Sequence, residues 1–156
     1  MKIEILVIGK AQKSEFEAPI SDYIKRIKPY FDIQFIHFYS KEKMKSSIEE
    51  TLKLEAQIIL EYLAKQNSWN IVLDAQGKTF NSFSFASYFE KKIMEGNKKI
   101  IFIIGSSYGL STELKQKASE AISLSTLTFP HQITRLILVE QLYRSLTIIH
   151  NQKYNH

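Results

Sequence analysis

The feature that most constrains the fold of this chain is an unbroken apolar run at residues 100–104, which ends at Gly105. Five apolar residues without polar alternation predict a short strand that is buried on both faces. The sequence GSSYGL follows, and its glycines at positions 105 and 109 predict a sharp turn or a close approach of the backbone to another group. Ser111 is then a candidate N-cap, and Glu113 would lie in the first turn of the next helix. Strand, turn and helix in this order form the repeating unit of an α/β fold.

The same order recurs along the whole chain. Five short and mostly apolar segments are predicted strands: residues 2–8, 32–39, 69–75, 100–104 and 121–124. Segments of helical periodicity separate them, and the last helix is predicted from about residue 133 to residue 150. This alternation predicts an α/β fold with a mainly parallel sheet of about five strands and helices on both faces. A chain of 156 residues fits one domain, residues 1–156.

Two of the helices carry signals at their starts. In the first, Ser14 and Glu17 have capping-box spacing, but Pro19 would then lie inside the helix. The helix therefore either starts near Pro19 or is kinked there. A solvated charge run at residues 41–46 precedes the second helix, which is predicted from about residue 46 to residue 65. Its predicted core stripe consists of Ile48, Leu52, Ile59 and Leu63.

The middle of the chain has its own boundary signals. The third strand is predicted to stop at a turn formed by residues 76–78. Ser82 or Ser84 can cap the helix that follows, and Gly96 is expected at the C-terminal end of that helix.

Composition narrows the class of protein. The chain has no cysteine, which excludes disulfides and thiolate metal sites. Its four histidines do not have metal-ligand spacing, so we expect no metal. No apolar stretch approaches the roughly 20 residues that a membrane span needs, and we expect a cytoplasmic protein without a membrane partner. A net charge of +5 suggests a polyanionic partner, and Arg135 and Arg144 on the last helix favour a nucleic acid.

Three predicted loops should meet at one edge of the sheet. They follow the strands that end near Asp74, at Ile104 and near Leu124. Ligands of open α/β sheets bind beyond the carboxyl ends of the strands, so these loops predict a pocket. The third loop alternates small polar and apolar residues from position 124 to position 129. Such a loop suits a crevice that holds a flat heterocycle between side chains while backbone groups bind its edge.

Several motifs in this order carry a family resemblance. GSSYGL at 105–110, SLSTLTFPHQ at 123–132, RLILVEQLYRSLTII at 135–149 and a tyrosine near the end resemble the RlmH family, as do IEILVIGK and LDAQGK nearer the start. These small SPOUT-class methyltransferases methylate N3 of a pseudouridine in bacterial 23S ribosomal RNA. The resemblance implies S-adenosylmethionine as cofactor, a C-terminal trefoil knot over about residues 100–150, a homodimer, and action on the assembled ribosome.

The resemblance also implies which residues act. Those expected to contact the cofactor are Leu73, Gly105, Leu124, Ser125, Thr126, Leu127, Thr128 and Phe129. Those expected in catalysis are His131, Arg135, Tyr154 and His156, and those expected to contact RNA are Arg135 and Arg144. An internal ion pair of Arg144 with Glu140, four residues earlier on the helix, is the alternative role of that arginine. The chain differs from many members at Ser106, where they have a second glycine, and at His156, which lies one residue later than their tail histidine.

Two other classes of function remain open at this stage. The sequence GSSYG fits G-x-S-x-G between a strand and a helix, which would make Ser107 the nucleophile of a serine hydrolase, with His131 as base. Alternatively, the altered glycine loop and tail are compatible with a ribosome- or RNA-binding module that has the fold without the chemistry.

Overall fold

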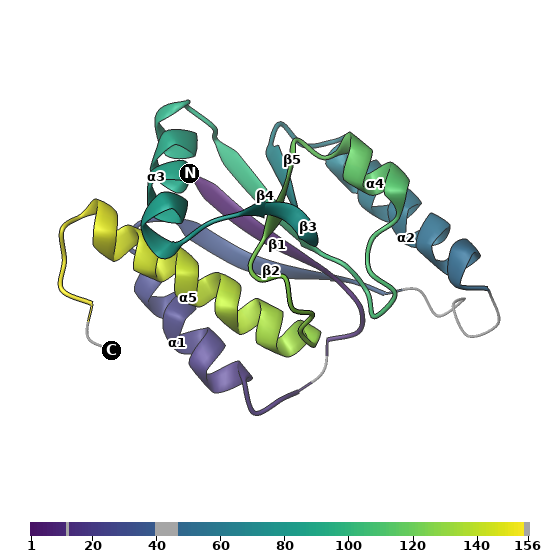
Figure 1. Ribbon diagram of the computed structural model, residues 1–156, viewed down its shortest axis with the longest axis horizontal. Coiled ribbons are helices and arrows are strands. Elements are labelled where there is room, and N and C mark those ends of the chain that lie inside the picture. The colour runs from purple at the N-terminus through teal and green to yellow at the C-terminus, as the bar shows by residue number, and fades with distance from the viewer. Residues whose placement is uncertain (12, 40–46, 155–156) are drawn as a thin grey trace.

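The computed structural model describes residues 1–11, 13–39 and 47–154, and these form one five-stranded sheet with helices against it (Figure 1). The predicted charge run at 41–46 lies outside the described residues. The elements are β1 (Lys2–Ile8), α1 (Glu17–Ile27), β2 (Asp32–Phe38), α2 (Ile48–Leu63), β3 (Trp69–Thr79), α3 (Ser82–Met94), β4 (Lys99–Ile104), α4 (Thr112–Lys117), β5 (Glu120–Ser123) and α5 (His131–Ile149).

The strands lie in the order β2-β1-β4-β3-β5, and all four pairings are parallel. The predicted α/β class and parallel sheet of five strands are therefore confirmed. β1 and β4 lie inside the sheet, and the apolar residues 100–104 of β4 are buried. Continuous apolar runs form these strands because both of their faces are covered.

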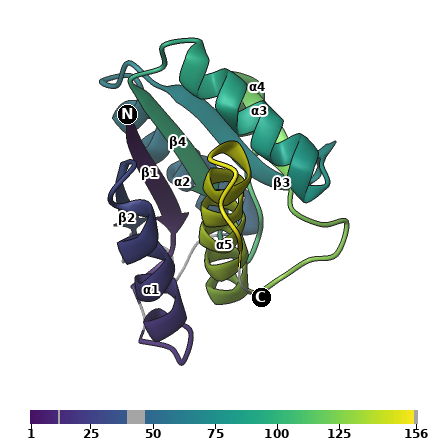
Figure 2. The ribbon, with the colours of Figure 1, turned by 90° about the vertical axis from the view of Figure 1, so that its left-hand side faces the viewer.

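Helices cover both faces of the sheet, as predicted. Figure 2 shows α5 between α1 and α3 on one side. On this side Ile20 of α1, Phe89 of α3 and Leu142 of α5 share a core with β1 and β4. On the other side Ile59 of α2 and Leu114 of α4 pack against the same strands. Since α5 is packed against the sheet and between two helices, it has apolar residues around most of its circumference.

The structure shows where the first three predicted helices begin. α1 begins at Glu17, so Pro19 lies in the first turn, where a missing backbone N–H is tolerated. α2 begins after Ser47, which forms a capping box with Glu50. The prediction that Ser82 or Ser84 caps α3 was wrong. Asn81 is the N-cap, and Ser84 is the third helical residue. The Ser84 hydroxyl oxygen accepts a hydrogen bond from the Asn81 backbone N–H.

The predicted core stripe of α2 was partly wrong. Ile59 and Leu63 are buried, but Ile48 in the first turn is 57% exposed. The stripe that faces the sheet instead contains two polar side chains, Thr51 and Glu55. Hydrophobic periodicity missed these two residues because it assigns polar side chains to the solvent-facing side of a helix.

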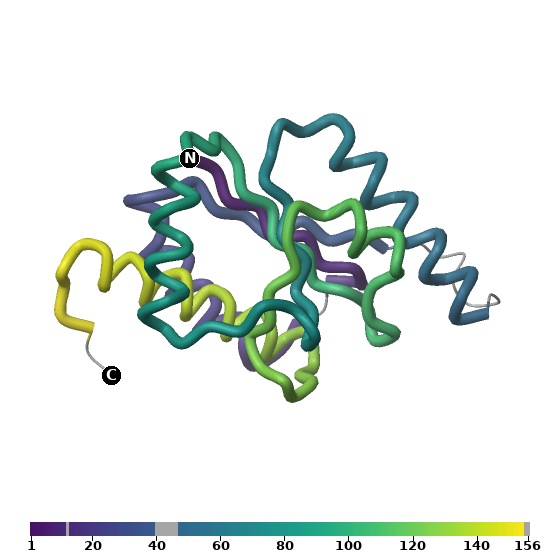
Figure 3. Tube along the Cα trace, turned by 45° about the horizontal axis from the view of Figure 1, so that its top comes forward, coloured from purple at the N-terminus to yellow at the C-terminus, as the bar shows by residue number. Residues whose placement is uncertain are grey.

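The third strand does not stop at residues 76–78. β3 continues to Thr79 through a register shift between Leu73 and Lys78, and it stays paired with β5 on both sides of that shift. Gly77 marks a close approach of two strands: a Cβ built on it would lie 2.6 Å from the carbonyl carbon of Ile122. Figure 3 shows β5 beside the end of β3, before the chain turns into the loop that leads to α5.

The chain returns from the edge strand β5 to the middle of one face, where α5 lies. The trefoil knot over about residues 100–150 that the resemblance implies stays a prediction.

A side chain at position 77 is expected to force β3 and β5 apart. We expect Gly77→Ala to destabilise the protein by about 1–3 kcal/mol, as overpacking does, and so to lower the melting temperature by about 2–10 °C. Thermal unfolding followed by circular dichroism measures the change. The control is Gln76→Ala, at the exposed neighbouring position. A melting temperature equal to that of the unsubstituted protein would contradict the close approach.

Candidate functional site

A pocket of about 790 Å³ lies beside the bend in β3, at the end of β4 and where the loop after β5 returns toward α5. The predicted residues that line it are Leu73, Gly105, Leu124, Ser125, Leu127, Thr128, Phe129 and His131. Thr126 of the predicted cofactor loop is not among the lining residues. The three loops that the sequence placed at one sheet edge therefore share one cavity.

The turn after β4 forms one wall of this pocket. Ser106 and Gly109 exchange two backbone hydrogen bonds of 3.1 and 2.8 Å, which close a tight hairpin around Ser107 and Tyr108. Gly109 has a φ of +83°, a conformation that favours glycine. Gly105 has no room for a side chain, because a Cβ would lie 2.5 Å from the Gly109 carbonyl oxygen. Ser106, at the position of the second family glycine, has a φ outside the left-handed region.

The loop after β5 forms the facing wall. The Ser123 hydroxyl donates to the Ser125 carbonyl at 2.8 Å, and the Leu127 N–H donates to the Ser125 hydroxyl at 3.0 Å. These bonds hold a compact loop whose Leu127 side chain is 69% exposed. Pro130 then caps α5, and His131 is the first residue of that helix. The sequence folds this way because proline fixes φ at a value suited to a helix start.

Two fully charged side chains line the pocket, Asp74 at the bend of β3 and Lys115 of α4, and they form an ion pair. Burial acts to raise the pKa of Asp74. Hydrogen bonds from Lys115 and from the Gln76 N–H outweigh it and hold that pKa below the ordinary value of 3.8. The stabilisation from this carboxylate is therefore present above pH 3.8 and is lost as the pH falls through the lower folded-state pKa.

Arg135, predicted in catalysis and RNA binding, is not among the lining residues. Its side chain is buried and makes a bidentate pair with Glu17 of α1, with N–O distances of 2.8 and 3.1 Å. The guanidinium group also lies 4.7 Å from the centre of the Phe35 ring. These contacts join α5 to α1 and β2, so the geometry favours a structural role for this arginine.

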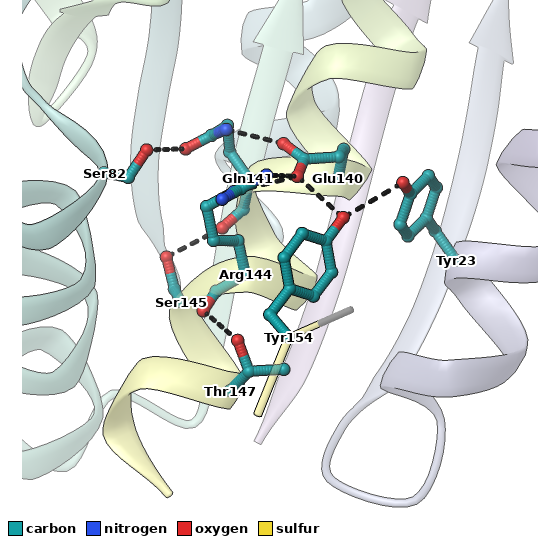
Figure 4. Close-up of polar contacts among 8 residues, drawn as sticks. All are labelled: Tyr23, Ser82, Glu140, Gln141, Arg144, Ser145, Thr147 and Tyr154. Carbon is teal, nitrogen blue, oxygen red and sulfur yellow. Dashed lines mark hydrogen bonds and ion pairs between the residues drawn. The ribbon is translucent and has the colours of Figure 1, made fainter. Parts of the chain in front are cut away.

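The C-terminal tail folds back onto α5, where Glu140 binds three side chains (Figure 4). The Tyr154 hydroxyl donates to Glu140 at 2.9 Å, and the Arg144 Nε donates to the same oxygen at 2.9 Å. The Arg144–Glu140 ion pair that helical spacing suggested is therefore present. The Arg144 guanidinium also lies 4.3 Å from the centre of the Tyr154 ring, and the hydroxyl groups of Tyr154 and Tyr23 are 3.2 Å apart. His156 lies outside the described residues.

These contacts set the protonation of Tyr154. Burial raises the pKa of its hydroxyl group, and the hydrogen bonds with Tyr23 and Glu140 raise it further. The hydroxyl group is therefore protonated at neutral pH, where it can donate a hydrogen bond but cannot act as a base.

The structure separates the predicted catalytic residues into two groups. His131 lies at the pocket, at the start of α5, whereas Tyr154 binds Glu140, nine residues further along that helix. At 1.5 Å per residue this separation is roughly 13 Å. His131 therefore lies at the pocket end of α5, and Tyr154 lies against the middle of that helix.

Sequence reasoning missed several residues around the site. Lys115 and Glu55 were not singled out, and Glu17 was considered only for its capping-box spacing to Ser14, although Glu17 binds Arg135 and the Ser106 hydroxyl donates to Glu55 at 2.9 Å. Their partners lie 41 to 118 positions away along the chain, so no local spacing could reveal the pairs. Glu140 is the exception, because its i, i+4 spacing to Arg144 is a recognised signal.

An α/β sheet whose loops build a pocket beyond the carboxyl ends of parallel strands defines a ligand-binding α/β protein. Among the described residues, no helix is long and apolar enough to span a membrane. The whole chain, residues 1–156, matches the family model described as predicted SPOUT methyltransferase.

Similar proteins agree with this match. The chain is 41% identical over 158 residues to a protein of Christiangramia forsetii named ribosomal RNA large subunit methyltransferase H, with 100% of this chain and 99% of that protein covered. It is 39% identical over 156 residues to a protein of the same name from Pseudothermotoga lettingae, with both chains fully covered. A solved structure, that of a probable methylase family protein from Haemophilus influenzae Rd KW20, shares the fold with a TM-score of 0.52 at 16% identity. That alignment covers 96% of this chain and 66% of that one.

The chain belongs to the SPOUT methyltransferase family, and the RlmH resemblance is confirmed. It is a methyltransferase. The two alternative functions, a serine hydrolase and a non-enzymatic ribosome- or RNA-binding module, are therefore not supported.

Removal of the Lys115 charge should change the titration of Asp74. We expect the Asp74 pKa to rise in Lys115→Met, because burial would remain while the cation that offsets it would be gone. A carboxyl-carbon NMR titration measures this pKa directly. Lys117→Met is the matched control, since Lys117 pairs with Glu113 on the exposed face of the same helix and should leave the Asp74 pKa unchanged. An unchanged Asp74 pKa in Lys115→Met would contradict the assignment.

Proposed function

We propose that this protein transfers a methyl group from S-adenosylmethionine to N3 of a pseudouridine in bacterial 23S ribosomal RNA, and that it acts on the assembled ribosome in the cytoplasm. The observation that carries the proposal is the shared pocket at residues 73, 105 and 124–131, where the resemblance places the cofactor. Full-length similarity to proteins named ribosomal RNA large subunit methyltransferase H supports ribosomal RNA as the substrate. We propose likewise that residues 1–156 form one domain with a knot over about residues 100–150.

The pocket suits a cofactor with a flat heterocycle and a charged end. Its volume of about 790 Å³ lies in the range of small-molecule sites, which is roughly 300–1,000 Å³. Apolar walls come from Leu73, Leu124 and Leu127, and the ion pair of Asp74 with Lys115 supplies polar groups. Gly105 would hold the backbone wall close to the ligand, because a side chain has no room there.

Bound S-adenosylmethionine would supply an electrophilic methyl group on its sulfonium. N3 of the pseudouridine is an imide nitrogen that carries a proton, and it must lose this proton to become a good nucleophile. His131 lies at the pocket and is our candidate for accepting that proton, directly or through a water molecule. Tyr154 would instead donate a hydrogen bond to the imide oxygen as negative charge develops there, its single hydroxyl proton turning from Glu140 to the substrate. The protein would contribute further by holding the two reacting atoms in line.

RNA would be recognised mainly through charge and shape. The net charge of +5 provides salt-dependent attraction to phosphates, and such contacts position a protein on RNA without reading its sequence. Arg144 is our candidate for an RNA contact, because it lies with Tyr154 in the tail network. Arg135 would act indirectly, since its guanidinium group binds Glu17.

A homodimer would bring the two groups of residues together. In one subunit Tyr154 binds Glu140, which lies nine residues, or roughly 13 Å along the α5 axis, from His131. We infer that the tail of one subunit completes the pocket of its partner. Two large apolar side chains, Phe83 and Leu127, are 72% and 69% exposed and are candidates for the dimer contact.

Calorimetric titration with S-adenosylmethionine tests the cofactor assignment, with NAD as the negative control ligand. We expect saturable binding, and we expect Gly105→Val to weaken it about tenfold or more, since a side chain there displaces the pocket wall. Ser87→Ala on the exposed face of α3 is the control variant, and circular dichroism checks that each variant is folded. Methylation of ribosomes with a labelled methyl group is the next measurement. Absence of any binding of S-adenosylmethionine by the unsubstituted protein would contradict the proposal.

Mixed subunits test the composite site. Gly105→Val subunits would have a defective pocket and an intact tail, and Tyr154→Phe subunits the reverse. After the two are unfolded and refolded together in equal amounts, we expect methylation to recover to about a quarter of the unsubstituted level. Half of the dimers would then contain both kinds of subunit, and one of their two sites would be intact. Each variant refolded alone is the control. A mixture no more active than the two variants alone would place both groups in one subunit.

A further inference from the structure

The pocket wall at residues 105–110 is tied to a helix on the far side of the sheet by one polar contact. The Ser106 hydroxyl donates a hydrogen bond of 2.9 Å to a carboxylate oxygen of Glu55. Glu55 belongs to α2 and is only 4% exposed. Ser106 lines the pocket, whereas Glu55 is not among the lining residues.

The position of the hydroxyl group suits a connecting role. The Ser106 oxygen also accepts a hydrogen bond of 3.3 Å from the Tyr108 N–H, at the tip of the hairpin. The backbone of Ser106 is itself bonded twice to Gly109. One side chain therefore contacts the tip of the turn and the buried helix, while its backbone closes the hairpin. Hydrogen bonds to a charged acceptor are stronger than neutral ones, and a buried carboxylate requires such donors.

The other end of the turn is fixed by apolar contacts. Leu110 and Leu114 are buried in the same core as Ala56 and Ile59 of α2. The hairpin between the two attachments includes Ser107 and Tyr108, which are exposed. Without the Ser106–Glu55 bond, the first half of the turn would keep its internal hydrogen bonds but lose this connection to α2.

We propose that Ser106 and Glu55 form a strut that positions the 105–110 turn for binding the methyl donor. Both act as positioning residues through the backbone of the turn, and Glu55 is not among the residues that line the pocket. The proposal rests on the proposed function, since it concerns the same pocket. It also accounts for a serine at the position of the second family glycine: the side chain adds a connection that a glycine cannot make.

A double-mutant cycle tests the strut. We expect Ser106→Ala to raise the dissociation constant for S-adenosylmethionine about three- to tenfold, as loss of a charged hydrogen bond does when part of its energy supports binding. Glu55→Gln keeps an acceptor oxygen and should have a smaller effect. The double variant should bind no more weakly than Ser106→Ala alone, because without the Ser106 hydroxyl group the change at Glu55 has no shared bond left to weaken. Ser106→Thr keeps the hydroxyl group and should restore most of the affinity.

A second measurement does not depend on the ligand. Hydrogen exchange of the Ser106 and Gly109 amides in the free protein should be faster in Ser106→Ala than in the unsubstituted protein, because the turn would open more often. Gln57→Ala is the matched control. Gln57 lies on the exposed face of α2, where its amide N–H donates a hydrogen bond to Glu61. It should change neither the affinity nor the exchange.

The outcomes separate the two proposals. If the unsubstituted protein does not bind S-adenosylmethionine, the proposed function fails, and the exchange measurement still decides whether the strut exists. If the unsubstituted protein binds and Ser106→Ala binds equally well, the positioning role is overturned. Additive effects of the two substitutions would overturn it too, because residues of one strut must be coupled.

Discussion

The structure depends on the close approach of β5 to β3 at Gly77. This contact holds the short strand β5 at the sheet edge across the bend in β3, with pairing on both sides of the bend. The loop from Leu124 to Pro130 starts from that strand, so the position of β5 sets the position of one pocket wall. The bend also places Asp74 where it can pair with Lys115 of α4. A larger residue at position 77 would therefore disturb the sheet edge and the pocket together.

Most of the fold could be predicted from the sequence because its strands are buried on both faces. The apolar runs at residues 5–8 of β1 and 100–104 of β4 predict a parallel sheet with two helical layers. The wrong predictions concern residues whose position depends on contacts with segments far away in the chain. The neighbours of Gly77 in the sequence predict a turn. A glycine is instead required there because β5 approaches the backbone of β3 closely. Ile48 fits the helical stripe, yet it lies in the first turn of α2 and is exposed.

The candidate site was predictable in outline for a different reason. Parallel strands point to one edge of the sheet, so the bend in β3 and the loops after β4 and β5 meet there, and motif order identified these segments. Ion pairs and hydrogen bonds between distant segments could not be predicted in this way. Arg135 shows the consequence: its place in the sequence suggests a substrate contact, whereas its bond to Glu17 joins two helices. Arg135 is close in sequence to the pocket residue His131, but it contributes to the pocket indirectly. It holds the helix that carries His131.

That helix, α5, links the two functional regions and keeps them apart. It is packed between α1 and α3 and against the sheet, so it is a rigid spacer with His131 at one end. At its middle Glu140 binds Tyr154, and the Tyr23 hydroxyl and Arg144 hold the same ring. A polar C-terminal tail would ordinarily fray, and these contacts order it against that tendency. The proposed dimer with composite sites would give this order a function, because the tail of one subunit could then meet the pocket of the other.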